Sequence, residues 1–396
     1  MAKLMVVDEQ RDTRIPFLRG MLTRSLQNAG LNFEHAYRIA SEIRDDLDDL
    51  DLITTEELRE KIIEVLAEEA PDKILTRYRK EDIYRENLLV TYADGHSEPF
   101  SRGIHAQRLE SCSLPIDRCN AITRKIHSAL IKSKVRNIQV VELVKMTYQA
   151  ILADLGQEYA DYYLVWNDFL HSHRPLIVLI AGVPGTGKST VATDLSTKLN
   201  IVRTQSTDML REVMRVLIPT RLSPVLHASS FEAGEHLVRS EHVVLDEETT
   251  ILNGYMHQAE MVEVACNAVI QRAINERVSI IMEGVHIRPS LLKNIPDSDA
   301  IVVPVTLGVL DKSRLARHIK GRSHQAKQRR AQRYLDSLDK IWQLQTVLLS
   351  EADTADIEII NNLDRYETIS EVIKTITQTM AANYKNNLPS LRAAYE

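Results

Sequence analysis

The chain has 396 residues, of which 44% are hydrophobic and 26% charged, so it can bury the cores of two or three domains and is not intrinsically disordered. Its formal net charge of −6 argues against a protein dedicated to binding nucleic acid. Three cysteines without disulfide or metal spacing, no signal peptide and no run of about 18 apolar residues favour a cytoplasmic protein that does not span a membrane.

The first half of the chain contains an internal duplication. The phrase Ile15-Pro16-Phe17-Leu18-Arg19-Gly20 returns 83 positions later as Glu98-Pro99-Phe100-Ser101-Arg102-Gly103. Apolar residues continue at the same spacing, as in Leu26 with Leu109, Ile39 with Ile122, Ile43 with Ile126 and Leu47 with Leu130. A stretch this long in register predicts two copies of one domain, at residues 1–88 and 89–170.

Each copy is predicted to open with a short strand and to continue as amphipathic helices. We expect strands at residues 4–7 and 88–92, and Asp94-Gly95 predicts a hairpin turn in the second copy. Thr54 and Glu57 have the spacing of a capping box at a helix start. Helices are expected at residues 16–29, 34–49 and 55–69 in the first copy, and at 101–111, 115–132 and 138–155 in the second.

This order of elements resembles the ATP-cone, a small regulatory domain that binds nucleotide with a hairpin and a helical bundle. The resemblance implies a regulatory nucleotide at one or both copies. The basic hairpin turn of that family is reduced here to Arg11 and Arg14 in the first copy, and to His96 and Arg102 in the second. A helical scaffold without a ligand is the alternative, and residue spacing does not decide between the two.

The second half, residues 171–396, is predicted to be one α/β domain. Aromatic residues from 159 to 169 stand at helical spacing, which predicts a helix that docks the repeats onto it. Apolar strands then alternate with helical patterns, which is typical of a parallel sheet wrapped by helices, with ligands at the carboxyl ends of its strands. We expect the strands at residues 176–181, 201–204, 278–282, 300–307 and 357–360.

A phosphate-binding loop follows the first of these strands and opens a helix that is expected to reach residue 199. It reads Gly182-Val183-Pro184-Gly185-Thr186-Gly187-Lys188-Ser189-Thr190, which fits the pattern G-x-x-x-x-G-K-[ST] in its required context. Its glycines let backbone N–H groups approach a triphosphate. Lys188 can reach the β- and γ-phosphates and Ser189 can ligate Mg²⁺, so the loop predicts ATP and Mg²⁺ as ligands.

Phosphoryl transfer also needs a group that prepares the acceptor and cations that bind it. Asp208 follows the second predicted strand, where it can accept a hydroxyl proton or help to hold Mg²⁺; a helix N-cap is its structural alternative. Arg211 and Arg215 are four residues apart and share one helix face, which suits a small dianion. A solvated or ion-paired face is the alternative for these two arginines.

The third predicted strand ends in Glu283, at a position where an acid can order the Mg²⁺ water shell. His286 and Arg288 follow it and are predicted to face the acceptor, although a lone histidine is more often structural. Asn361, after the fifth strand, is predicted to border the adenine.

Residues 311–333 are rich in lysine and arginine. They predict a lid over the triphosphate, whose Arg317 and Arg322 stabilise charge on the transferring phosphoryl group. An RNA-binding patch is the alternative, but the stretch lies between two predicted strands and has no aromatic residue before Tyr334 for base stacking.

Four phrases carry a close resemblance to archaeal-type 2-phosphoglycerate kinase. They are Ser206 to Arg215, Leu226 to Phe231, Met282 to His286, and Pro99 to Gly103 in the second copy. The resemblance implies transfer of a phosphoryl group from ATP to 2-phosphoglycerate, giving 2,3-bisphosphoglycerate and ADP. It also adds His227 to the predicted acceptor contacts. The extra copy at residues 1–88 departs from the family pattern.

The sequence therefore predicts an ATP-dependent kinase of a small phosphorylated hydroxy-acid. Another small-molecule kinase, of the zeta-toxin-like type, and a nucleotide-sensing ATPase switch are the alternatives. An RNA-end kinase would rest on the basic stretch alone, and the acidity of the chain argues against it. The sequence leaves the oligomeric state open, a homo-oligomer included.

Overall fold

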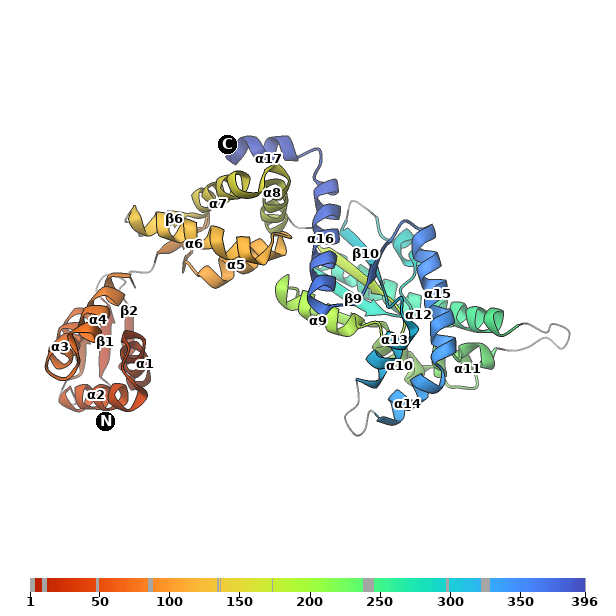
Figure 1. Cartoon of the computed structure of the whole chain (residues 1–396), viewed down its shortest axis with the longest axis horizontal. Helices are drawn as coiled ribbons and strands as arrows, with labels where there is room; N and C mark the ends of the chain where they lie inside the picture. The colour runs from red at the N-terminus through yellow and green to blue at the C-terminus, as the bar shows by residue number, and fades with distance from the viewer. Residues whose placement is uncertain are drawn as a thin grey trace. The chain divides into compact units, whose positions relative to one another are not determined.

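The computed structural model describes residues 4–8, 13–47, 50–84, 88–133, 135, 137–172, 174–237, 246–296, 299–321 and 328–395. The chain divides into two compact units (Figure 1). One comprises Met1–Phe100 with Lys134–Val140, and the other comprises Ser101–Ser133 with Val141–Glu396. The division at residues 88 and 170 follows the repeat in the sequence and stays a prediction, whereas these units follow the packing of the chain.

The first copy combines a hairpin, a third strand and four helices. Strand β1 (Met5–Asp8) pairs antiparallel with β2 (Thr13–Pro16) and parallel with β3 (Leu52–Thr54). The helices are α1 (Arg19–Ala29), α2 (Phe33–Asp46), α3 (Thr55–Glu69) and α4 (Asp72–Tyr84). The predicted capping box is confirmed, since the Glu57 N–H donates to Thr54 Oγ1 over 3.1 Å and the Thr54 N–H donates to Glu57 Oε2 over 2.9 Å.

The second copy has the same strand topology. Strand β4 (Leu89–Thr91) pairs antiparallel with β5 (Ser97–Pro99) and parallel with β6 (Asn137–Gln139). The predicted turn at Asp94-Gly95 is present, because Gly95 has a φ of +86° and its N–H donates to the Tyr92 carbonyl over 3.0 Å. Strands β3 and β6 were not expected, because three residues are too few to show a β pattern in the sequence.

The helices of the second copy belong to the second unit. They are α5 (Arg102–Ser111), α6 (Ile116–Lys132), α7 (Val140–Leu155) and α8 (Gln157–His171). The predicted docking helix is confirmed as α8, which packs against α16 (Arg365–Asn383) and α17 (Leu388–Tyr395). The buried Trp166 donates from Nε1 to Thr377 Oγ1 on α16 over 2.9 Å, and Asp161 forms a bidentate ion pair with Arg392 on α17.

The centre of the second unit is a five-stranded sheet in the order β11-β10-β7-β9-β8, in which every neighbouring pair is parallel. The strands are β7 (Leu176–Ala181), β8 (Arg203–Ser206), β9 (Ile280–Gly284), β10 (Ile301–Gly308) and β11 (Glu358–Asn361). All five predicted strands are confirmed, with small shifts at their ends. Every residue of the central strand β7 is buried, as expected of a strand covered on both faces.

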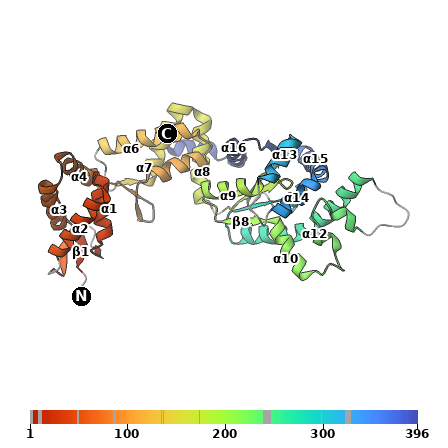
Figure 2. The same ribbon diagram turned by 60° about the horizontal axis from the view of Figure 1, so that its bottom comes forward.

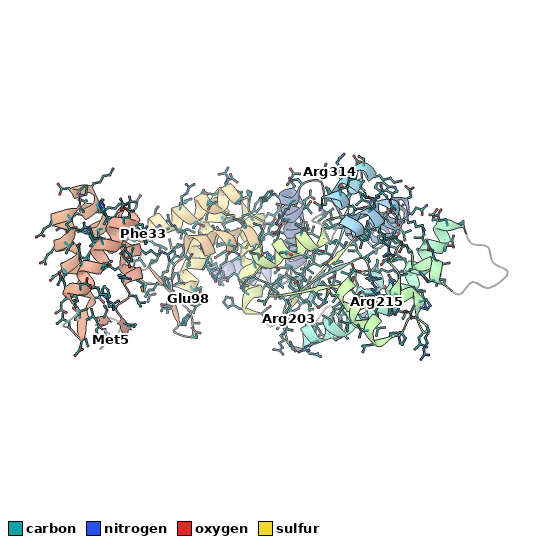
Figure 3. All side chains as sticks on the ribbon, turned by 90° about the horizontal axis from the view of Figure 1, so that it is seen from below. Met5, Phe33, Glu98, Arg203, Arg215 and Arg314 are labelled. Carbon is teal, nitrogen blue, oxygen red and sulfur yellow. The ribbon has the colours of Figure 1, made fainter. Side chains whose placement is uncertain are left out.

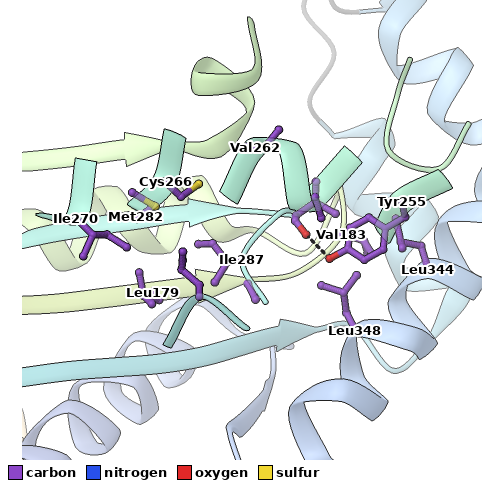
Figure 4. Packing of buried hydrophobic residues seen from close by; sticks show 14 of the residues in the cluster. Leu179, Val183, Tyr255, Val262, Cys266, Ile270, Met282, Ile287, Leu344 and Leu348 are labelled. Carbon is purple, nitrogen blue, oxygen red and sulfur yellow. Dashed lines mark hydrogen bonds between the residues drawn. The ribbon is translucent and has the colours of Figure 1, made fainter. Parts of the chain in front are cut away.

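Helices cover both faces of this sheet (Figure 2). Helices α12 (Glu247–Asn275) and α15 (Leu338–Thr354) pack on one face, and α9 (Lys188–Lys198) and α16 on the other. Figure 4 shows the core under α12 and α15, where the Tyr255 hydroxyl donates to the Val285 carbonyl over 2.9 Å among aliphatic side chains. The fold class is thus α/β, with a parallel sheet wrapped by helices.

Shorter helices surround the carboxyl ends of the strands. They are α10 (Thr207–Leu217), α11 (Pro224–His227), the 3₁₀ turns Ala233–His236 and Pro289–Asn294, α13 (Lys312–Lys320) and α14 (Gln328–Asp336). The three cysteines are buried and unpaired. Within the described residues, no helix has both the length and the apolar character needed to cross a bilayer.

Candidate active site

The phosphate-binding loop leaves β7 in a conformation that only glycine adopts easily. Gly182, Gly185 and Gly187 have φ values of +145°, +97° and +87°. A Cβ on Gly187 would lie 2.3 Å from the amide nitrogen of Asn362, and one on Gly182 would lie 2.5 Å from the Leu307 carbonyl oxygen. The close approach of neighbouring groups therefore requires glycine at both positions.

Lys188 and Ser189 form the first turn of α9. The buried Lys188 ammonium donates from Nζ to the Val183 carbonyl over 2.9 Å, so the lysine lies along its own loop. Ser189 Oγ donates to Glu283 Oε1 over 3.0 Å. The structure thus brings together Ser189 and Glu283, two of the predicted Mg²⁺ ligands, as a hydroxyl and a carboxylate. These are the oxygen donors that Mg²⁺ prefers.

Asn362, next to the predicted adenine contact Asn361, holds the loop from the far side, a role that was not predicted. Its Nδ2 donates to the Thr186 carbonyl over 2.8 Å, and its Oδ1 accepts from Thr368 Oγ1 over 2.9 Å. Asn361 accepts from the Leu310 N–H through Oδ1 over 3.3 Å, and its contact with adenine stays a prediction. The only available signal was an asparagine pair directly after a strand.

The other loop residues take ordinary places. Thr186 is buried and its Oγ1 donates to the Val183 carbonyl over 2.9 Å. Pro184 is half-buried, and the exposed Thr190 donates its N–H to the Gly187 carbonyl over 3.0 Å. The loop is therefore stabilised by hydrogen bonds within it as well as by Asn362.

A cavity of about 530 Å³ lies between α10, the segment after α11, and α14; these three helices are labelled in Figure 1. Its wall contains four residues predicted to meet the acceptor or its hydroxyl, namely Asp208, Arg211, Arg215 and His227. It also contains residues that were not predicted as individual site residues: Met209, Glu212, Ala228, Ser229, Arg333 and Tyr334. We refer to this space as the acceptor cavity.

Asp208 lies in the first turn of α10, and the N-cap position of that helix is occupied by Ser206. The side chain of Asp208 is 61% exposed, in contrast to the buried Thr207 before it. The N-cap alternative is therefore wrong, and the carboxylate is available to the acceptor cavity.

The two arginines of α10 lie in the wall of the cavity with part of their hydrogen-bonding capacity unused. Arg211 donates from Nη1 to the Ala228 carbonyl, and its Nη2 lies 3.7 Å from Asp208. Arg215 donates from Nη1 to Glu212 over 2.7 Å. The Nε atoms of both arginines are buried without a hydrogen-bond partner. Both arginines therefore keep donor capacity that the described residues do not use.

Two predicted acceptor contacts are corrected by the structure. His286 is buried, with a ring that is hydrogen-bonded at both nitrogens to Thr207, Ser230 and Gln258. Arg288 forms a bidentate ion pair with Glu351 of α15, over 2.8 and 3.1 Å. Neither side chain lines the acceptor cavity, because the turn after β9 directs both into the protein.

His227 does line the cavity, but its ring is already occupied. Its Nε2 lies 2.8 Å from the Ile218 carbonyl and its Nδ1 lies 3.2 Å from Thr220 Oγ1. The carbonyl requires a proton on Nε2, so Nδ1 accepts from the threonine. His227 therefore shapes the wall of the cavity, with both ring nitrogens engaged by the protein.

The described part of the basic stretch forms α13 and α14. Of its two predicted lid residues, Arg317 is described by the structure and Arg322 is not. Leu315 and Ile319 of α13 pack on the loop, since a Cβ on Gly185 would lie 2.9 and 2.8 Å from them. Arg317 is exposed, and at two residues from each it lies on the opposite face of α13. The structure therefore does not bring Arg317 to the loop, and Arg322 lies outside the described residues.

Arg333 is the member of the basic stretch that reaches the acceptor cavity. Its guanidinium pairs with Glu232, and this pairing raises its pKa. Arg215 on α10 and Arg314 on α13, both labelled in Figure 3, belong to the second unit, as the phosphate-binding loop does. Arg314 donates to the Leu363 carbonyl, next to Asn362.

A parallel sheet that places a triphosphate loop, a serine–carboxylate pair and an arginine-lined cavity at its carboxyl edge defines the class of this protein. Its fold is that of a P-loop kinase.

The particular family follows from comparison with proteins of known activity. The chain is 31% identical over 290 residues to a 2-phosphoglycerate kinase of Pyrococcus horikoshii. The aligned region covers 73% of this chain and 93% of that protein. It is 34% identical over 280 residues to the 2-phosphoglycerate kinase of Pyrococcus furiosus, covering 71% of this chain and 90% of that protein. The chain belongs to the 2-phosphoglycerate kinase family.

A third relative has the same named activity. The 2-phosphoglycerate kinase of Methanothermobacter thermautotrophicus is 32% identical over 285 residues, covering 72% of this chain and 92% of that protein. No protein-family model matches the sequence. The matched lengths exceed the whole of residues 171–396, so the similarity reaches into the helical region before β7.

Proposed function

We propose that the chain transfers the γ-phosphoryl group of ATP to the hydroxyl of 2-phosphoglycerate, giving 2,3-bisphosphoglycerate and ADP. The observation that carries this proposal is the acceptor cavity, where a carboxylate and two arginines with unpaired buried Nε atoms share one wall. The acceptor has two anionic groups and one hydroxyl, which match two guanidiniums and one proton acceptor. The named activity of the relatives supports the same substrate.

On the nucleotide side, the loop N–H groups and the N-terminus of α9 bind the phosphates. Lys188 exchanges the Val183 carbonyl for a phosphate oxygen, because an ammonium bonds more strongly to an anion than to a neutral carbonyl. Ser189 and Glu283 would hold Mg²⁺, which supplies charge neutralisation on the phosphate oxygens when bound.

On the acceptor side, Arg211 and Arg215 bind the carboxylate and the phosphate of 2-phosphoglycerate. The acceptor hydroxyl oxygen forms a bond to the γ-phosphorus while the bond to the β–γ bridging oxygen breaks. Asp208 accepts the hydroxyl proton, and ADP leaves with the bridging oxygen. Arg333, in place of Arg317, lies where it can compensate charge in the cavity.

The test is ADP release, measured in a coupled assay with 2-phosphoglycerate, 3-phosphoglycerate, glycerate and no acceptor, together with identification of the phosphorylated product. We expect ADP release to depend on 2-phosphoglycerate and to yield the bisphosphate. Turnover with a different acceptor would indicate another small-molecule kinase. Hydrolysis that no acceptor stimulates would indicate an ATPase switch.

A variant separates the role of Asp208 from simple binding. Asp208→Asn keeps the size of the side chain and removes its basicity, so we expect kcat to fall by about 10²–10⁴-fold with little change in the KM for ATP. The matched control is Glu212→Gln, which removes a carboxylate from the same wall. Equal effects of the two substitutions would show that charge alone, and not proton acceptance, is what Asp208 contributes.

Regulation by nucleotide at residues 1–170 stays a proposal. In the second copy, His96 Nε2 lies 3.3 Å from Glu98 Oε1, and this carboxylate would disfavour a phosphate beside it. Arg11 of the first copy lies outside the described residues. Nucleotide binding that persists after Lys188→Met has disabled the catalytic loop would support a second nucleotide site, and its complete loss would contradict one.

A further inference from the structure

A cluster of buried polar side chains joins the residue before Asp208 to the wall of the acceptor cavity. Its members are Thr207, Ser230, Gln258 and His286, none of which is more than 5% exposed. They come from four separate places, namely the start of α10, the segment after α11, the middle of α12 and the turn after β9. Buried polar groups normally have hydrogen-bond partners. The donor and the acceptor of each hydrogen bond in the cluster can therefore be assigned.

Gln258 fixes the orientation of the whole cluster. Its Nε2 donates to the carbonyls of Val225 and Ala228, over 2.6 and 3.1 Å. Its Oε1 is therefore the acceptor end, and it accepts from Ser230 Oγ over 2.8 Å. His286 Nε2 lies 3.1 Å from the same Oε1, so this ring nitrogen must carry the proton.

The remaining nitrogen of His286 then acts as an acceptor. Nδ1 lies 2.9 Å from Thr207 Oγ1, and the threonine hydroxyl donates to it. Gly284 closes this corner, because a Cβ on it would lie 1.8 Å from Thr207 Oγ1. Burial lowers the pKa of His286 to about 4, which agrees with a neutral ring that accepts at Nδ1.

The cluster reaches the acceptor-binding residues at two points. Thr207 immediately precedes Asp208, and both lie in the first turn of α10. The Ala228 carbonyl, which Gln258 holds, also accepts from Arg211. A change at Gln258 or His286 therefore changes the placement of the proposed proton acceptor and of an anion-binding arginine.

We propose that His286 and Gln258 are positioning residues for the phosphoryl acceptor. They hold the start of α10 and the segment Val225–Ser230 in one relative geometry without touching the acceptor themselves, an inference that rests on the proposed function of the cavity. The β9 turn, which would meet Mg²⁺ through Glu283, is thereby coupled to the acceptor wall through His286.

The kinetic test compares Gln258→Met and Thr207→Val with Thr207→Ser. We expect the first two to raise the acceptor KM or lower kcat at least tenfold while the KM for ATP stays within twofold. Thr207→Ser keeps the hydroxyl and should stay within threefold of wild type. The matched control is Gln345→Met, which removes a buried glutamine that clamps Val309 from α15 by two similar bonds.

Several outcomes would overturn the positioning role. Folded Gln258→Met and Thr207→Val enzymes with unchanged acceptor kinetics would do so, as would an equal acceptor defect in Gln345→Met. If wild type uses another acceptor from the panel, the proposed substrate fails, and the same comparison is made with that acceptor.

The tautomer of the His286 ring, measured by NMR, tests the hydrogen-bond network even if the protein turns over no acceptor. In ¹⁵N-histidine spectra of the full chain, we expect the His286 ring as the Nε2–H tautomer, without titration above pH 5, and altered in Gln258→Met. An Nδ1–H tautomer, or titration near the ordinary histidine pKa of about 6.5, would refute the network on which the inference rests.

Discussion

At the scale of single residues, the site depends on a few atoms that meet across long stretches of sequence. Ser189 and Glu283 are 94 residues apart and share a hydrogen bond of 3.0 Å. Gly187 and Asn362 approach so closely that a methyl group cannot be inserted between them. Each of these contacts can be removed by a single substitution.

Removing either member of the serine–carboxylate pair should weaken Mg²⁺ use. We expect Ser189→Ala and Glu283→Gln each to raise the Mg²⁺ concentration for half-maximal activity by about tenfold or more, because each removes an oxygen donor. The double variant should lose less than the product of the two, since both act on one ion. If the loss of activity in the double variant equals the product of the two single losses, the two residues act independently.

Gly187→Ala should disable the loop. Its methyl group would meet the Asn362 amide at 2.3 Å, at a φ of +87° that alanine adopts poorly. We expect activity to fall by about 100-fold or more and ATP binding to weaken, measured by kinetics and calorimetry. The control is Gly20→Ala in α1, where nothing lies within 4 Å of the new methyl group. That change should stabilise the chain by about 0.5–1 kcal/mol.

The two buried histidines should make stability depend on pH. Burial lowers the pKa of both His105 and His286 to about 4, below the value of about 6.5 in an unfolded chain. The unfolded chain therefore binds these protons first as the pH falls. Stability is fully present above about pH 6.5 and is lost toward pH 4, at most by about 3 kcal/mol per histidine. Denaturant unfolding at a series of pH values measures this loss, and a flat profile would contradict it.

At the scale of elements, the sequence predicted those strands and loops whose formation depends on residues close together in the chain. The loop after β7 and the five apolar strands were predictable because glycine spacing and hydrophobic runs report backbone needs directly. Strands β3 and β6 were not, since three residues show no period. His286 and Arg288 were misplaced for a different reason. A sequence shows that polar residues follow a strand, but only the packed turn shows that they face Gln258 and Glu351.

Helix α5 caps the far end of the loop helix α9, and this contact should affect catalysis from a distance. Gln107 Nε2 donates to the Thr197 carbonyl over 3.0 Å, and Ser111 Oγ donates to the Lys198 carbonyl over 2.9 Å. Lys198 also pairs with Glu110 over 2.7 Å. These bonds satisfy carbonyls that a helix end leaves open.

We expect Gln107→Ala with Ser111→Ala to destabilise the second unit by about 1–2 kcal/mol, because two helix-end carbonyls lose their donors. The KM for ATP should rise as α9 loses its fixed end. Thermal unfolding and ATP kinetics measure both effects. Ser41→Ala is the control, since Ser41 bonds only within its own helix, over 2.8 Å to the Tyr37 carbonyl. If the double variant behaves like this control, the α5 contact has no bearing on the loop.

At the scale of the whole molecule, the sequence repeat and the packing divide the chain differently. The strands of the second copy lie in one compact unit and its helices in the other. Helices α5–α8 are therefore part of the structure that supports the kinase sheet. A sequence repeat cannot show this, because it records common ancestry of two segments and not the surfaces that each one buries.

Trp166→Ala measures how much the kinase sheet depends on α8. Trp166 is 4% exposed and donates to Thr377 on α16. We expect a loss of about 3–5 kcal/mol and a single, lower unfolding transition for the second unit. Phe33→Ala is the control, because Phe33 is 59% exposed in the first unit. Normal melting of the second unit after Trp166→Ala would show that α8 is a peripheral attachment.

Helix α16 contacts both the residue that holds the phosphate-binding loop and helix α8. Its first turn offers Thr368 to Asn362, which grips the Thr186 carbonyl of the loop, and nine residues further on Thr377 accepts from Trp166. A helix segment of nine residues is about 14 Å long and bends little. A displacement of α8 would therefore be expected to move the residues that hold the phosphate-binding loop. Through this helix, α8 of the second copy is linked to the phosphate-binding loop.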